Sequence, residues 1–267
     1  MLEAVKYVFK EHFDNRGLIL KMAIVNMNKQ TLRTSLGVLW LYLHDFVYFF
    51  VFVLFRVLMA GSGQIDGMHN VVYLVTGLIP WFYINEVLNV GSASIKSYRG
   101  IIQSIKFPIT VIPSIEITAI FFKRMPTYIF IFVVCYIYGY LWDFNIFLFL
   151  YYTLCMLMLM YALMLVISAF VAVSSDFQQL FLVTIRVLMY TMPIVWGYKH
   201  IVGIPTLNYI IHLNPMVYII NGYRDAFVVG DIPNLIYSAY FWLFVMALFV
   251  LGSFVQYKLR RYYSDLM

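Results

Sequence analysis

The chain has 267 residues, 64% of them hydrophobic and only 11% charged, with a formal net charge of +6. An ordinary soluble domain is about half apolar and about a quarter charged, so one globular core with a charged exterior is excluded. Disordered chains are poor in aliphatic and aromatic residues, so the composition instead predicts an all-α polytopic membrane protein of about six spans.

The N-terminal segment, residues 1–35, is polar by the standard of this chain. Leu2, Val5, Phe9 and Phe13 fall at helical spacing, with charged residues elsewhere on the helix. This pattern predicts an amphipathic helix in the membrane interface, with a cytoplasmic location for the segment. The alternative is a short helix outside the membrane that packs on the protein itself.

Six apolar stretches follow and together form the predicted transmembrane domain, residues 36–255. The predicted spans are residues 36–60, 71–93, 109–142, 146–173, 180–196 and 236–255. Gly77 and Pro80 fall inside the second span, where membrane helices tolerate them.

The third stretch and the segment before the last span are irregular. Because Lys123-Arg124 and Pro126 interrupt the third stretch, we expect a helix entering from the interface and a separate deeper part from Met125 to Trp142. Two short apolar pieces, Leu207–Leu213 and Met216–Val229, are too short to span the membrane and predict re-entrant or interfacial helices.

The basic residues predict the orientation. Segments 1–35, 94–108 and the tail 256–267 together hold twelve Lys and Arg, whereas the loops on the opposite side hold two. This bias predicts that both termini are cytoplasmic. It also accounts for the positive net charge without a nucleic-acid partner, because the cations flank apolar runs.

Several ionisable residues lie inside the predicted spans. They are His44, Asp45, Arg56, Glu86, Glu116, Lys123, Arg124 and Arg186. Intramembrane charges are costly and often functional, but we expect most of these to be structural or interfacial, with Arg56, Lys123 and Arg124 reaching a membrane surface. Carboxylates at matching depth, as a proton relay would need, are not evident in the sequence.

Catalytic signals are weak. The chain has no His-Glu-x-x-His, Gly-x-Ser-x-Gly or phosphate-binding Gly-x-x-x-x-Gly-Lys-[Ser/Thr] pattern, and its two cysteines lie in apolar runs. We therefore expect no catalytic residue, no metal site and no cofactor in this chain. A polytopic glycosyl- or acyltransferase is the alternative, and it would need a polar acid/base or metal-binding cluster. An ion-coupled transporter would favour inverted repeats, which are not evident.

Aromatic residues cluster near predicted helix breaks. Tyrosine and tryptophan combine an apolar ring face with a polar group, which suits both membrane-interface belts and the faces of sugar rings. The residues that we expect along a carbohydrate path are Trp81, Phe82, Tyr83, Tyr190, Trp196 and Tyr198.

A series of short motifs resembles the membrane subunits of ABC-2-type polysaccharide exporters, the teichoic acid and O-antigen export family. The motifs are Ser35–Trp40, Gly77–Phe82, Ile105–Pro108 with Val111–Pro113, Pro193–Trp196, and Leu213–Pro215 with Gly222–Arg224. The motifs occur in the same order as in that family, and the resemblance extends over essentially the whole chain. His44-Asp45 and Ser175-Asp176 depart from the family pattern.

The resemblance implies a homodimer of this chain in the bacterial plasma membrane, bound to two copies of a separate ATPase that uses ATP and Mg. It implies an undecaprenyl-linked polysaccharide as cargo. Lys96, Arg99 and Lys106 are expected to contact the ATPase or the lipid pyrophosphate. Near anionic headgroups, each such cation contributes about 1 kcal/mol to attraction. The alternative for these three is orientation in the membrane alone.

Overall fold

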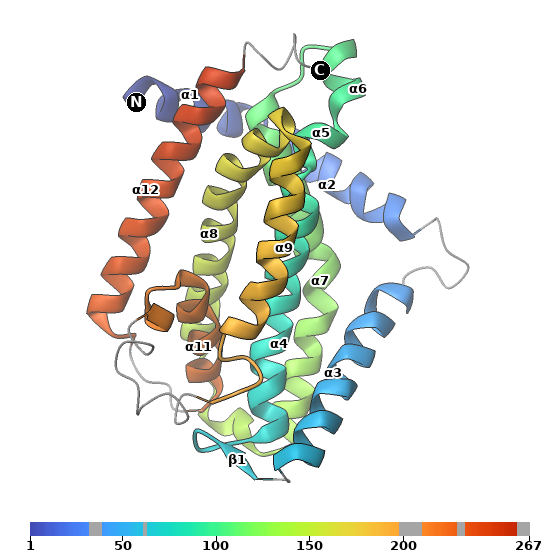
Figure 1. Cartoon of the computed structure of the whole chain (residues 1–267), viewed down its shortest axis with the longest axis vertical. Helices are drawn as coiled ribbons and strands as arrows, with labels where there is room; N and C mark the ends of the chain where they lie inside the picture. The colour runs from blue at the N-terminus through green and yellow to red at the C-terminus, as the bar shows by residue number, and fades with distance from the viewer. Residues whose placement is uncertain (32–38, 61–62, 198–209, 229–232, 261–267) are drawn as a thin grey trace.

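The computed structural model describes residues 1–31, 39–60, 63–197, 210–228 and 233–260. Long helices run side by side along the molecule (Figure 1). Helix α1 (Leu2–Asp14) and helix α2 (Arg16–Thr31) lie at one end of the molecule. The only strands among the described residues are β1 (Gln64–Ile65) and β2 (Met68–His69), at the opposite end.

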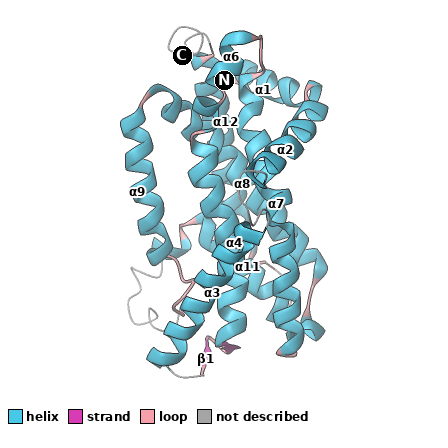
Figure 2. Cartoon of the chain, turned by 90° about the vertical axis from the view of Figure 1, so that its right-hand side faces the viewer, coloured by secondary structure: helices cyan, strands magenta, loops and turns pink. Residues whose placement is uncertain are grey.

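Six long helices make up the bundle. They are α3 (Leu39–Ala60), α4 (Asn70–Glu86), α7 (Ile112–Ile137), α8 (Ile146–Val173), α9 (Ser175–Thr191) and α12 (Leu235–Leu259). Among the described residues, four segments are long and apolar enough to cross a membrane: Asn70–Gly91, Ile109–Ile137, Ile146–Val173 and Leu235–Leu259. Helices α3 and α9 flank these four (Figures 1 and 2). The prediction of an all-α polytopic membrane protein is confirmed.

The third apolar stretch forms one continuous helix, and the predicted break near Met125 is wrong. A single 3-10 turn, Ile109–Val111, leads into α7, which continues past Pro126 to Ile137. Only the last residues, Tyr140–Asp143, form a separate 3-10 turn. The side chains of Met125 and Pro126 are exposed, and α7 stays helical through the proline although one backbone N–H donor is missing there, as membrane helices tolerate.

The fifth long helix is offset from its predicted span, 180–196. Helix α9 begins at Ser175, where the Ser174 hydroxyl accepts a hydrogen bond from Phe177 N–H as an N-cap. It ends at Thr191, because Met192 is extended. The residues up to Trp196 are therefore not part of the helix.

The remaining elements are short. The basic segment forms α5 (Ser94–Ser97) and α6 (Arg99–Ser104) after a π-helical turn, Val87–Gly91, at the end of α4. Helix α11 (Pro215–Val228) matches one of the two predicted short pieces. Of the other, Leu207–Leu213, residues 207–209 lie outside the described residues, and residues 210–212 are helical.

The β1–β2 hairpin lies between the first two predicted spans. Asp66 and Gly67 both have positive φ angles, 50° and 91°, as a two-residue type I′ turn requires. The aspartate–glycine pair is a strong signal for this turn, so it explains the hairpin.

The core of the chain lies around α4 and α8. In the membrane-spanning segment Asn70–Gly91, which contains α4, 83% of the apolar stretch is buried inside the protein. In α12 the buried share is 17%. Helix α9 buries only Ile185 completely. The outer helices therefore keep apolar faces for lipid or for another protein chain.

Candidate functional site

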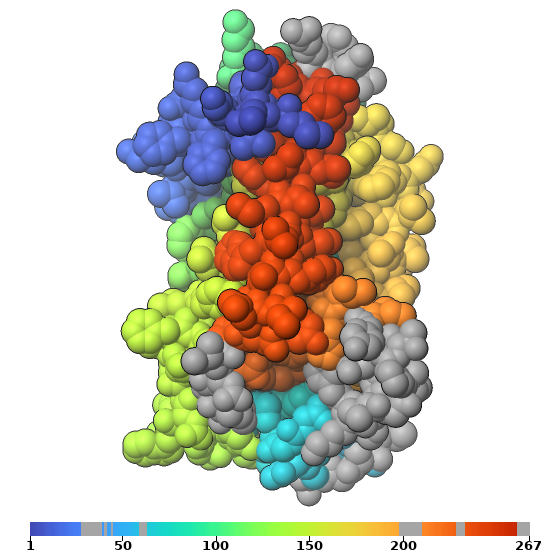
Figure 3. Space-filling view, turned by 90° about the vertical axis from the view of Figure 1, so that its left-hand side faces the viewer, coloured from blue at the N-terminus to red at the C-terminus, as the bar shows by residue number. Residues whose placement is uncertain are grey.

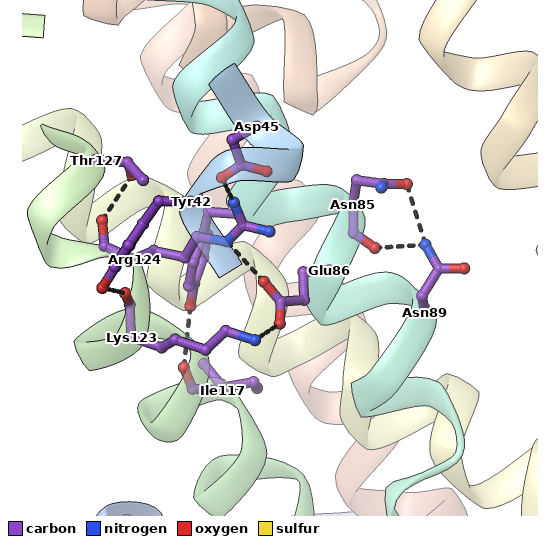
Figure 4. Close-up of polar contacts among 10 residues, drawn as sticks. Tyr42, Asp45, Asn85, Glu86, Asn89, Ile117, Lys123, Arg124 and Thr127 are labelled. Carbon is purple, nitrogen blue, oxygen red and sulfur yellow. Dashed lines mark hydrogen bonds and ion pairs between the residues drawn. The ribbon is translucent and has the colours of Figure 1, made fainter. Parts of the chain in front are cut away.

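Four charged side chains meet inside the bundle, at the junction of α3, α4 and α7 (Figure 4). Arg124 pairs with Asp45 and, through Nε at 2.6 Å, with Oε2 of Glu86; Lys123 pairs with the same Glu86 carboxylate. All four side chains are largely buried. We call Asp45, Glu86, Lys123 and Arg124 the charge cluster.

Each of the three helices contributes to the charge cluster: α3 carries Asp45, α4 carries Glu86, and α7 carries both cations. Lys123 and Arg124 are consecutive on α7 and lie about 16 Å along its axis from Ile112, near mid-helix. The Tyr42 hydroxyl of α3 donates a hydrogen bond to the Lys123 carbonyl at 3.0 Å, next to the Asp45 contact. Phe46 and Phe49, also on α3, pack edge-on against Phe130 of α7.

This arrangement corrects the expectation that Lys123 and Arg124 reach a membrane surface. Both cations turn inward because two carboxylates lie within bonding distance. In a low-dielectric interior, such pairing is what makes a buried charge tolerable. Asp45 and Glu86 also lie at matching depth, which the sequence did not reveal.

The charge cluster links three helices through ion pairs. Two carboxylates face two cations, so the four side chains carry no net formal charge. Among the described residues, no group of three or more His, Cys, Asp or Glu is placed to hold a metal ion. The cluster is thus suited to fixing α3 on α4 and α7 in one arrangement.

The other intramembrane charges have separate environments. Buried Glu116 accepts a hydrogen bond from Asn26 Nδ2 of α2 at 2.7 Å, while Arg186 is exposed on α9. Arg56 is half-buried near the end of α3. The side chain of His44 lies outside the described residues.

Three of the resemblance motifs meet around buried Arg224. Its guanidinium lies 3.6 Å from the ring centroid of Tyr73, and its Nη2 donates to the Ile194 carbonyl at 3.3 Å. A Cβ on Gly77 would lie 2.6 Å from the same nitrogen. The glycine therefore leaves room for the arginine, which connects α11, α4 and the segment after α9.

The predicted aromatic path residues lie in two different environments. Trp81 and Tyr83 belong to the protomer core and are at most 2% exposed. Tyr190 is 77% exposed on α9, and Trp196 Nε1 donates to its carbonyl at 3.1 Å. Half-buried Phe82 borders a small cavity beside the charge cluster. Tyr198 lies outside the described residues.

The three predicted coupling cations are exposed at the end of the bundle that carries α1. Lys96 of α5 donates a hydrogen bond to the Ser175 hydroxyl of α9 at 2.8 Å. Lys106 lines a shallow hollow together with Arg260 at the end of α12. Arg99 is exposed at the start of α6. These residues share one face but not one binding pocket.

Helix α1 is attached to the same end. Its His12 ring contacts the Ser114 hydroxyl of α7 at 2.9 Å and the Tyr161 hydroxyl of α8 at 3.0 Å. Leu2, Phe9 and Phe13 are exposed. The helix therefore packs on the protein through Ala4, Val8 and His12, whereas most of the predicted apolar stripe faces away from the protein.

A comparison with known proteins agrees with this architecture. Residues 20–228 match the family described as ABC-2 type transporter. The matched range begins in α2, ends with α11 and contains the charge cluster and the residues around Arg224. A search of curated proteins finds no match.

Proposed function

The chain belongs to the ABC-2 type transporter family and is thus a permease subunit of an ABC exporter, and we propose that it exports an undecaprenyl-linked cell-envelope polysaccharide, such as a teichoic acid or an O-antigen. The observation that carries the proposal is the family match over residues 20–228, within which the ordered polysaccharide-exporter motifs fall.

The proposed location is the bacterial plasma membrane, with both termini in the cytoplasm. The support is the distribution of charge on the bundle. The basic segment 94–108, α1 and the end of α12 gather at one end (Figure 1). Cytoplasmic loops carry the excess of Lys and Arg in membrane proteins, which makes this end the inner one.

The energy source of the proposed exporter is a separate ATPase, present in two copies, that binds ATP and Mg. The chain has no phosphate-binding loop of its own. We place the ATPase contact on α5, α6 and the start of α9; the Lys96–Ser175 hydrogen bond joins α5 to α9. ATP-driven closure of the ATPase pair would then favour one of two arrangements of the permease by binding it more tightly.

The cargo path of the proposed exporter lies at the seam of a homodimer. Helices α3 and α9 support this assignment because both expose many apolar side chains, among them Val47 and Val51 on α3 and Val183 and Val187 on α9. Tyr190 is exposed on this surface and contacts Trp196. In this arrangement Trp81 and Tyr83 are covered, so their contact with cargo requires a movement of α4.

The proposal is tested with the purified chain, alone and with its partner ATPase. We expect no ATP hydrolysis by the isolated chain, hydrolysis by the assembled complex, and polymer export by the complex in vesicles. Charge reversal of Lys96, Arg99 and Lys106 together should reduce export several-fold. Loss of copurification would assign these cations to docking, whereas normal assembly with poor export would assign them to the lipid pyrophosphate. Robust hydrolysis by the isolated chain would contradict the proposal.

A further inference from the structure

A polar hollow lies where α8, α11 and the start of α12 meet, at the end of the bundle away from α1. Its volume is about 260 Å³. Figure 3 shows the outer face of this region, with the first turns of α12 lying against α11. The hollow is slightly smaller than the roughly 300–1,000 Å³ typical of drug-sized ligands, so it matches a single ring-sized group.

The lining of the hollow is polar, although 64% of the residues in the chain are hydrophobic. Of the nine described residues around the hollow, seven carry a hydrogen-bonding side chain, including Asn221, Asp225 and Asn234. The Asn221 Oδ1 accepts from Arg224 Nη1 at 3.1 Å and the Asn234 Oδ1 accepts from Ile236 N–H at 2.9 Å. A carboxamide also donates through its NH₂ group, and a carboxylate accepts through two oxygens. Neighbouring hydroxyl groups of a sugar, each a donor and an acceptor, are matched by such a set.

Three tyrosine rings complete the lining: Tyr152 of α8, Tyr218 of α11 and Tyr237 of α12. Tyr237 stacks on the His212 ring with 5.4 Å between ring centroids. Aromatic rings supply the flat apolar surface against which the C–H face of a pyranose packs, and tyrosine adds a hydroxyl at its rim.

The hollow is held in shape before any ligand binds. Tyr218 stacks on Phe241 at 4.9 Å, and its hydroxyl contacts the Ser238 hydroxyl at 2.7 Å and the Tyr151 hydroxyl at 3.1 Å. Because these contacts fix the ring in advance, little side-chain entropy is lost on binding.

The same lining disfavours other ligand classes. No Lys or Arg is among the described residues that border the hollow, so a phosphate headgroup lacks the cationic partners that usually hold it. An organic ammonium group would use the rings and Asp225 but leave both carboxamides without a role. An uncharged, hydroxyl-rich ring uses all of them.

We propose that this hollow is a carbohydrate-binding site that holds one pyranose unit, outside the seam proposed for the cargo path. The site rests on the proposed function in one respect, because the exported polymer is the source of that sugar. It would hold a unit of polymer emerging at the outer surface and oppose its return.

The experiment uses the complete permease–ATPase complex in lipid nanodiscs and saturation-transfer NMR. The probes are the methyl glycosides of glucose, galactose, N-acetylglucosamine and N-acetylmannosamine, with choline and inorganic phosphate for comparison. We expect transfer to at least one glycoside and none to choline or phosphate. Transfer to none of the glycosides, or to choline or phosphate alone, would overturn the site.

Two variants locate the binding. Tyr237→Ala removes one aromatic wall and should weaken glycoside binding at least tenfold, whereas Tyr237→Phe keeps the ring and should weaken it no more than about threefold. The matched control is Tyr240→Ala on the same helix, because Tyr240 bonds to the Leu213 carbonyl and does not border the hollow. Equal binding by Tyr237→Ala and wild type would place the sugar elsewhere and refute the proposal.

Export measurements separate the site from the function on which it rests. If the complex exports polymer but Tyr237→Ala leaves glycoside binding unchanged, the site is wrong and the exporter assignment stands. If glycosides bind in the hollow but polymer export does not depend on this chain, the site stands and the assigned cargo is wrong.

Discussion

Asp45, Glu86, Lys123 and Arg124 illustrate how individual residues decide the stability of this bundle. Each is a charge in an apolar protein, and each faces an opposite charge from another helix. Removing one member of such a group leaves an uncompensated buried charge, whereas removing a complete pair does not.

Arg124→Met is therefore expected to destabilise the protein by about 3–5 kcal/mol, because it leaves Asp45 without its cation. The double variant Asp45→Asn/Arg124→Met should recover part of this loss. Thermal unfolding of the purified chain measures both, and Arg186→Met is the control because that arginine is exposed. Equal melting of the Arg124 and Arg186 variants would argue against a structural charge cluster.

His12 makes the attachment of α1 dependent on pH. Burial lowers the pKa of His12 below its ordinary value, although the Val8 carbonyl and the Glu11 carboxylate act in the opposite direction. When α1 detaches, the ring is exposed to water and titrates near about 6.5. As the pH falls through that value, His12 binds a proton more readily when α1 is detached than when it is attached. The free energy of attachment therefore decreases at low pH and is largest above this value.

Hydrogen exchange along α1, corrected for the intrinsic pH dependence of exchange, should therefore be faster at pH 5.5 than at pH 7.5. His12→Gln removes the titrating ring, and its corrected exchange should be the same at both pH values. An unchanged pH dependence in this variant would assign the effect to another group.

At the scale of elements, close packing of α11 on α8 depends on Gly222. A Cβ at this position would lie 2.1 Å from the ring of Tyr152, which is itself buried. Gly252 brings α12 close to α8 in the same way, since its Cβ would lie 2.7 Å from that of Leu165. Small residues at helix contacts are a common device of membrane bundles.

Gly222→Ala should therefore push α11 away from α8 and destabilise the protein by about 1–3 kcal/mol, the usual cost of overpacking a core. Gly100→Ala is the matched control, because nothing lies within 4 Å of its added Cβ. Melting temperatures of the two variants test the difference. A Gly222→Ala protein as stable as the Gly100→Ala protein would contradict the packing seen here.

For the whole molecule, the asymmetry of charge predicts which end lies in the cytoplasm. Single cysteines at Lys10 and Ser97 should react only with reagents that reach the cytoplasm, and cysteines at Gln64 and Asp143 only with reagents added outside. Both native cysteines, Cys135 and Cys155, are buried, so background labelling is low. External labelling at Ser97 would reverse the proposed orientation.

The class of the protein and most of its helices can be predicted from the amino-acid sequence alone. Apolar run length is a local property, and it placed the fourth long helix at Ile146–Val173 and the last one within a few residues of Leu235–Leu259. Reading the sequence failed where a local signal was misleading, as at Pro126, because α7 continues through this proline to Ile137.

Only the tertiary structure decided which polar residues meet. Arg124 and Asp45 are 79 residues apart, and Lys123 and Glu86 are 37 apart, so no short sequence window contains either pair. The sequence shows that these four residues are charges within predicted spans, but their pairing depends on how α3, α4 and α7 pack. The same holds for the hollow between α8, α11 and α12: the sequence supplies its tyrosines and carboxamides, and packing alone places them around one space.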